Sequence, residues 1–238
     1  SFHTLCDTIG VTLIHDVATG RLIVDTGFCI DTVVLTGATS DVNNYVVIKN
    51  GFHGTVVLRN LDMSFLSQFQ GNNSPIRVEG SSVSNMSANT EVNFILDGNN
   101  SITNLDRGRA CIQVDQGTTV RFSAIDPDDN SSGTLCVKQR SQRGGAAIGS
   151  IERSAGSSLG TYVSEPIYSA PNIWGQDDSV AGGNIVISSG LYMIKGGHGA
   201  GIGGGHGVYY DGMILIYGGE VRASTIYHAA GIGSGCPT

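Results

Sequence analysis

Short runs in which apolar and polar residues alternate recur along the whole chain. Each run spans three to five residues and is bounded by Gly, Asn, Asp or Ser, a pattern typical of short β-strands. No segment keeps a 3.6-residue apolar period over ten residues, so we expect almost no helix. In the first half the runs are Val46–Ile48, Thr55–Leu58, Ile76–Val78, Val92–Leu96, Cys111–Val114 and Thr119–Phe122.

The second half of the chain repeats itself. The run Ile185-Val-Ile187 returns 29 residues later, and Ile202 and Ile232 are 30 residues apart. Gly183–Asp211 and Gly212–Thr238 are therefore two copies of one unit, made of a strand, Gly, a second strand and Gly-Ile-Gly. A fixed period of this length indicates a stack of similar structural units.

A third copy of the unit opens at Gly133 and reaches Gly149. Because Ile148 lies 54 residues before Ile202, we expect an insertion over about Glu152–Ala181, which holds the only Trp of the chain. Glycine punctuates these copies, since 35 of the 238 residues are Gly.

Strands this short, in units of about 20–30 residues, predict an all-β right-handed parallel β-helix, or solenoid. In that fold Ile148, Ile202 and Ile232 would form one interior stack. We expect residues 1–40 to cap the end of the solenoid and residues 41–238 to form its coils. A β-sandwich has similar strand spacing, but it does not explain a motif that recurs at a fixed period.

The Gly-rich phrases resemble the repeats of bacterial cell-surface right-handed β-helix proteins, which include adhesin-like proteins and a carbohydrate-binding β-helix group. The phrases that carry the resemblance are Gly199-Ala-Gly-Ile-Gly-Gly-Gly205, Gly212-x-Ile-x-Ile-x-Gly-Gly-x-Val-x-Ala223 and Ala229-Ala-Gly-Ile-Gly-Ser-Gly235. The resemblance covers about Gly133–Gly235, and the first half shares only its rhythm. It implies contact with glycans by a secreted or cell-surface protein.

The net charge is −7, which argues against a nucleic-acid partner because phosphate binding needs a basic face. No run of about 18 apolar residues is present, so we expect no transmembrane segment. The chain begins at Ser1 without Met, as a trimmed exported form would. It ends directly after a repeat, which predicts either a longer chain or cover by another subunit, such as a homo-oligomer.

The five cysteines cannot all pair with one another. Cys6 and Cys29, or Cys111 and Cys136, are each about one coil apart, so either pair could bridge neighbouring coils. Buried thiols are the equal alternative. The lack of Cys-x-x-Cys argues against zinc.

Two motifs resemble signatures of the pectinase-type β-helix glycosidases, namely Trp174-Gly-Gln-Asp-Asp178 and Gly197-His-Gly199. The resemblance implies that Asp177 and Asp178 are catalytic carboxylates and that His198 orients them, since glycoside hydrolysis needs paired carboxyl groups. The Asn-Thr-Asp and Arg-Ile-Lys motifs of that family are absent. The alternative is that the two aspartates are solvated turn residues in the insertion.

The segment Asp126-Pro-Asp-Asp-Asn130 concentrates oxygen ligands. Asp126, Asp128 and Asp129 could therefore bind Ca²⁺, although the segment lacks the glycine spacing of an EF-hand loop. The same residues are ordinary turn formers. No other cofactor is expected.

Two kinds of side chain are candidates for glycan contact. Arg140 and Arg143 could pair with uronate or sulfate groups, or could form a solvated strand edge. The rings of Trp174, Tyr209 and Tyr210 could pack on sugar faces, or Trp174 could anchor its own loop. His198, His206 and His228 form a loose set that could bind a metal, but their spacing defines no site.

The sequence therefore predicts an extracellular glycan-binding or adhesin-like module. The alternative is a glycoside hydrolase or lyase that acts on an acidic polysaccharide. A third hypothesis is a structural stalk that has no ligand.

Overall fold

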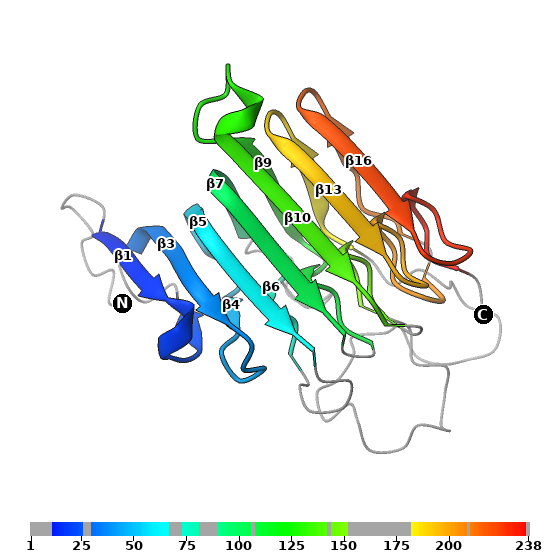
Figure 1. The fold of residues 1–238 in the computed structure, drawn as a ribbon, viewed down its shortest axis with the longest axis horizontal. Helices are drawn as coiled ribbons and strands as arrows, with labels where there is room; N and C mark the ends of the chain where they lie inside the picture. Colours follow the sequence, from blue (N-terminus) through cyan, green and yellow to red (C-terminus); the bar gives the residue numbers. More distant parts are fainter. Residues whose placement is uncertain are drawn as a thin grey trace, which may run out of the picture.

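The computed structural model describes residues 11–25, 30–66, 73–80, 90–105, 108–141, 144–151, 182–208 and 210–236 (Figure 1). The regular secondary structure of these residues is almost entirely strand, apart from two short 3-10 turns, η1 (Val17–Thr19) and η2 (Asn130–Ser132). The named strands pair only in parallel within two sheets. The all-β prediction is confirmed, and so is the expectation of almost no helix among the described residues.

Seven strands of the first sheet run side by side from the blue end of the chain to the red end in Figure 1. The seven strands, in sheet order, are β1 (Val11–Asp16), β3 (Ile30–Thr39), β5 (His53–Phe65), β7 (Thr90–Asn104), β10 (Gly133–Gln139), β13 (Leu191–Gly196) and β16 (Glu220–Thr225). The two longest, β5 and β7, lie near the middle of the row and pair with strands on both sides.

The first sheet also has a second row of shorter strands, which starts from the first half of β7. This row is formed by β9 (Thr118–Ala124), β12 (Asn184–Ile187) and β15 (Ile214–Ile216). Strand β7 is long enough to pair with β9 through Thr90–Leu96 and with β10 through Gly98–Asn104. From β7 onward, two separate strands therefore replace one long strand.

The second sheet has seven short strands in chain order. The chain passes alternately between the sheets, so each strand of the second sheet follows and precedes strands of the first. The strands are β2 (Leu22–Val24), β4 (Val46–Ile48), β6 (Ile76–Val78), β8 (Ile112–Val114), β11 (Ile148–Gly149), β14 (Ile202–Gly203) and β17 (Ile232–Gly233).

Isoleucines at one register position form a ladder across the second sheet. Ile148 pairs with Ile202, and Ile202 pairs with Ile232, so the predicted stack is confirmed. The ladder continues to Ile112 and Ile76 in the earlier strands. Ile148 and Ile202 are fully buried, whereas Ile232 at the edge is 45% exposed.

The repeat copies pair in register, with one correction. Ile185 lies beside Ile214, as the repeat predicts. The third copy, however, does not open at Gly133, because the strand that pairs with β12 is β9, which begins at Thr118. Strand β10, which begins at Gly133, pairs with β13 instead. The matching residues in β9 are a valine and a phenylalanine rather than isoleucines, which hides the copy in the sequence.

Inward-facing side chains of both sheets form one core. Along β7 and β9 buried positions alternate with more exposed ones, as expected where one face of a sheet is covered. Phe94 and Phe122 stack with ring centroids 4.9 Å apart, and Tyr192 meets the Phe122 ring edge-on. Burying each such ring contributes roughly 1.5–3 kcal/mol, so the stack stabilises the centre of the molecule.

The outer face of the first sheet carries ion pairs between neighbouring strands. Arg59 pairs with Asp97, and Arg121 pairs with Glu91, each across adjacent strands. These ion pairs are about half exposed and contribute little to stability. Their charged groups lie on the solvent side of the sheet, away from the core.

The described part of residues 1–40 supplies β1, β2 and β3, which pair in parallel with the strands that follow. The capping role of this segment stays a prediction. The predicted insertion, 152–181, lies entirely outside the described residues. Among the described residues, no helix has the length and apolarity that a membrane span requires.

Cys111 and Cys136 are both thiols, so they do not bridge neighbouring strands. Cys111 is buried beside the second sheet, while Cys136 lies half-buried in the first, and the alternative of unbridged thiols holds for this pair. Cys6 and Cys29 lie outside the described residues.

Candidate functional site

A polar hollow lies at the amino ends of β9, β12 and β15, which are neighbours in the first sheet. Its volume is about 250 Å³, and it is open to solvent. Three separate segments supply its lining, namely Gln116–Thr119, Gly182–Asn184 and Asp211–Gly212. Only parallel pairing brings these segments together, since they come from three different passes of the chain.

Hydrogen bonds hold the walls of this hollow in place. The Asp211 carboxylate accepts from the backbone N–H of Gly182 at 3.0 Å, and Asn184 accepts from the N–H of Met213 at 3.0 Å. The Thr118 hydroxyl donates to the Asp115 carbonyl at 2.7 Å. Asp211 is the one charged residue of the lining, which therefore suits a neutral ligand better than an acidic one.

Tyr210 packs against the glycines of this hollow. A side chain at Gly182 or Gly212 would collide with its ring, and its hydroxyl donates to the Gly183 carbonyl. Burial, together with the neighbouring Asp211 carboxylate, raises the pKa of Tyr210. The half-buried Tyr210 supports the wall of the hollow, and its predicted contact with a sugar ring stays a prediction.

Several predicted site residues fall outside the described residues. They are Asp177, Asp178, Trp174, Tyr209 and Arg143, and their roles stay predictions. Arg140, which directly follows β10, is described and exposed. Its backbone N–H donates to the Asn104 carbonyl. Its role in anion binding also stays a prediction.

The three aspartates predicted to bind Ca²⁺ are exposed and hold a turn together. Asp126 accepts from the N–H of Asp128 at 3.1 Å, and Asp129 accepts from the N–H and the hydroxyl of Ser131 at 2.9 and 2.6 Å. The two bonds from Ser131 lower the pKa of Asp129. The carboxylates act as turn and cap acceptors here, and calcium binding stays a prediction.

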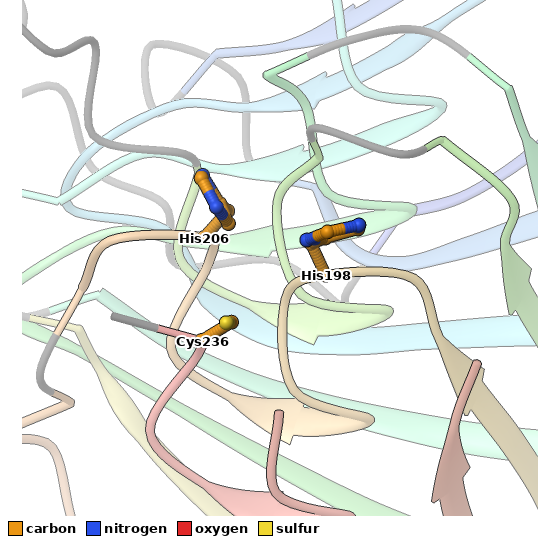
Figure 2. A group of neighbouring side chains, drawn as sticks. All are labelled: His198, His206 and Cys236. Carbon is orange, nitrogen blue, oxygen red and sulfur yellow. The ribbon is translucent and has the colours of Figure 1, made fainter. Parts of the chain in front are cut away.

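His198 lies in a cluster that the sequence did not define. Its ring is 5.2 Å from that of His206, centroid to centroid, and 4.1 Å from that of Tyr227. Cys236 joins the two histidines, and the possible ligand atoms of the three residues all lie within 4.8 Å of one another (Figure 2). Two imidazoles and a thiol at this separation can ligate a single transition-metal ion.

The sequence had pointed to part of this cluster. His198 and His206 belonged to the loose histidine set, but His228 is exposed and is not a member. Cys236 was missed as a ligand because it belongs to the next repeat copy. The signal that could have found it is the flanking glycine, since all three residues directly follow a Gly.

Comparison with models of known protein families, with curated proteins and with solved structures gave no match to this chain. The described residues contain two features with the geometry of a site, the polar hollow and the cluster of His198, His206 and Cys236.

Proposed function

We propose that this protein is a right-handed parallel β-helix that binds a neutral glycan outside the cell or at its surface. The alternation between two parallel sheets supports the solenoid, because each pass of the chain adds one strand to the second sheet and one long strand or two shorter strands to the first. The right hand follows from the strong general preference of parallel crossover connections. The resemblance to cell-surface β-helix repeats supports the location.

The polar hollow is the observation that carries the glycan proposal. Its volume of about 250 Å³ lies just below the range of roughly 300–1,000 Å³ typical of small-molecule sites, which suits one sugar residue of a longer chain. Amide, hydroxyl and carboxylate groups from Gln116, Thr119, Asn184 and Asp211 can bond to sugar hydroxyls. Rigid strands fix these groups, so little ordering is needed on binding.

Gln116 offers the sharpest test, because its side chain is exposed and we expect its removal to leave the fold intact. A panel of immobilised neutral and acidic polysaccharides would be tested for retention of the protein. We expect Gln116→Ala to weaken binding to the retained glycan by about tenfold, the value of roughly one hydrogen bond. Asn93→Ala removes an equally exposed amide on the outer face of β7 and serves as the control.

Equal loss for both variants, or retention of neither glycan class, would refute this assignment of the hollow. The same incubation distinguishes the polysaccharide-degrading alternative, because a hydrolase or lyase would release reducing or unsaturated ends. Sedimentation of the retained protein would test the predicted homo-oligomer.

A further inference from the structure

We propose that His198, His206 and Cys236 form a binding site for one divalent transition-metal ion of the zinc type. This site is separate from the polar hollow, since none of the three residues lines that hollow. The two proposals can therefore fail independently.

The separation of the ligand atoms fits one ion. Zinc binds imidazole nitrogen at about 2.0–2.1 Å and thiolate sulfur at about 2.3 Å, so two tetrahedral ligands lie roughly 3.3–3.6 Å apart. In the protein the ligand atoms lie within 4.8 Å of one another, and side-chain rotations can close the difference. The three side chains come from loops that lie close together in Figure 2.

The donor set selects the class of metal. Imidazole and thiolate are ligands for zinc and neighbouring transition metals, whereas Ca²⁺ and Mg²⁺ require oxygen. Three protein ligands leave a fourth position for water, as in zinc sites that are open to substrate. All three residues are half-buried, so an ion can reach them from solvent.

The backbone holds the three residues in place without a metal. The N–H of Cys236 donates to the His198 carbonyl at 3.0 Å, and the N–H of Gly207 donates to the Cys236 carbonyl at 2.8 Å. The N–H of His206 donates to the Gly144 carbonyl at 3.0 Å. Direct hydrogen bonds thus connect the ligand-bearing segments and reduce the ordering that a metal would impose.

Glycines let these segments approach one another. A side chain at Gly235 would collide with the carbonyl of Gly205, and one at Gly197 or Gly199 would collide with the carbonyl of Ser141 or Gly145. The glycines on both sides of His198 therefore have a packing reason, and Gly207 after His206 has a positive φ of 73°. Cys-x-x-Cys spacing marks sites built from local pairs, and its absence does not exclude a site assembled across repeat copies.

The test is metal binding by the purified 238-residue chain after removal of bound metal. Zn²⁺ would be added in competition with a chromophoric chelator, and Co²⁺ would serve as a spectroscopic probe. We expect one ion per chain, a tetrahedral Co²⁺ spectrum with a sulfur-to-cobalt charge-transfer band, and tighter binding at higher pH because the thiol must lose its proton.

Cys236→Ser and His206→Gln should each weaken Zn²⁺ binding by more than about 100-fold, beyond the 10–100-fold cost of altering a residue that only orients a ligand. Cys236→Ser should also abolish the charge-transfer band. His228→Gln changes an exposed histidine outside the cluster and should leave both readouts unchanged. Circular dichroism would confirm that each variant keeps its strands.

Three results would overturn the proposal. The first is an octahedral Co²⁺ spectrum without the sulfur band. The second is an equal loss of affinity in His228→Gln and Cys236→Ser. The third is binding of Cu²⁺ without binding of Zn²⁺, which would assign the cluster to a different metal.

Discussion

Glycine occupies the same register position in three successive strands of the second sheet. Gly149, Gly203 and Gly233 have φ values of 138°, 129° and 128°, a region that other residues rarely adopt. A Cβ at Gly149 would also collide with the Gly203 carbonyl, whereas the nearest atom to a Cβ at Gly233 is 3.6 Å away. The three glycines thus share one backbone conformation, but the space available for a side chain is smaller at Gly149 than at Gly233.

Alanine substitutions at these positions separate the two effects. Gly233→Ala should lower the free energy of unfolding by about 1–3 kcal/mol, the cost of the backbone conformation. Gly149→Ala should cost at least about 1 kcal/mol more, because the strands must also move apart. Urea unfolding of both variants measures the difference, and equal losses would show that the close approach of β11 and β14 is not tight.

The buried thiol of Cys111 makes stability depend on pH. Burial raises the pKa of Cys111, so the folded protein keeps this proton after the unfolded chain has lost it. The resulting stabilisation is complete below a thiol's ordinary pKa of about 8.5 and declines as the pH rises above that value. The decline should approach about 1.4 kcal/mol for each pH unit.

Comparing the wild type with Cys111→Ala tests this linkage. Urea unfolding at about pH 7 and about pH 9.5 gives the loss of stability for each protein, below the ordinary tyrosine pKa of about 10. The wild type should lose more than the variant. If both lose the same amount, Cys111 is not the group responsible.

At the scale of the elements, the pairing of β5 with β7 shifts register between Arg59 and Asp62. Asn60 in β5 has a φ of 47°, and Gly98 in the neighbouring β7 has a φ of 71°. The Asn60 side chain accepts from the N–H of Asn99 at 3.1 Å, and buried Asn100 accepts from the N–H of Leu61 at 3.0 Å. Asparagine side chains therefore satisfy backbone N–H groups where the register shift interrupts the regular pairing.

Substitution of Asn60 distinguishes its conformation from its hydrogen bond. Asn60→Gly keeps the left-handed conformation and loses one hydrogen bond, for about 1 kcal/mol. Asn60→Ala loses the bond and adds a conformational cost of about 1–2 kcal/mol. Thermal or urea unfolding should rank the variants in that order, and a more stable alanine variant would contradict the assigned geometry.

At the scale of the whole molecule, stability should vary along the stack of strands. Strand β7 pairs on both sides and alternates buried with more exposed residues, while β16 lies at the edge of the first sheet with no buried residue. Each strand contacts mainly its neighbours, so the edges can open without the centre.

Hydrogen exchange followed by mass spectrometry tests this gradient. Peptides that contain β7 or β10 should exchange slowly, near the rate of global unfolding, and peptides that contain β16 or β17 should exchange much faster. Uniform protection along the chain would instead indicate one cooperative unit, or an edge that is covered in solution.

Local patterns in the sequence were sufficient for short strands such as β4 and β6 and for the isoleucine ladder, whereas β5 and β7 extend well beyond the runs that predicted them. Inward residues of stacked parallel strands must recur at the same register, so Ile148, Ile202 and Ile232 could be aligned from their spacing alone. The copy that opens at Thr118 was misplaced because Val120 and Phe122 fill the same register with different side chains. Packing requires an apolar residue at that position but does not fix which one.

The candidate sites depended on tertiary structure. The polar hollow takes its lining from three separate segments. The proposed metal site brings His198 and His206 together with Cys236 from the following repeat copy. Sequence patterns report neighbours along a strand or a turn, whereas these contacts run between strands. Their geometry is set by the register of parallel pairing and by glycines that let backbones approach, and neither is visible until the chain is folded.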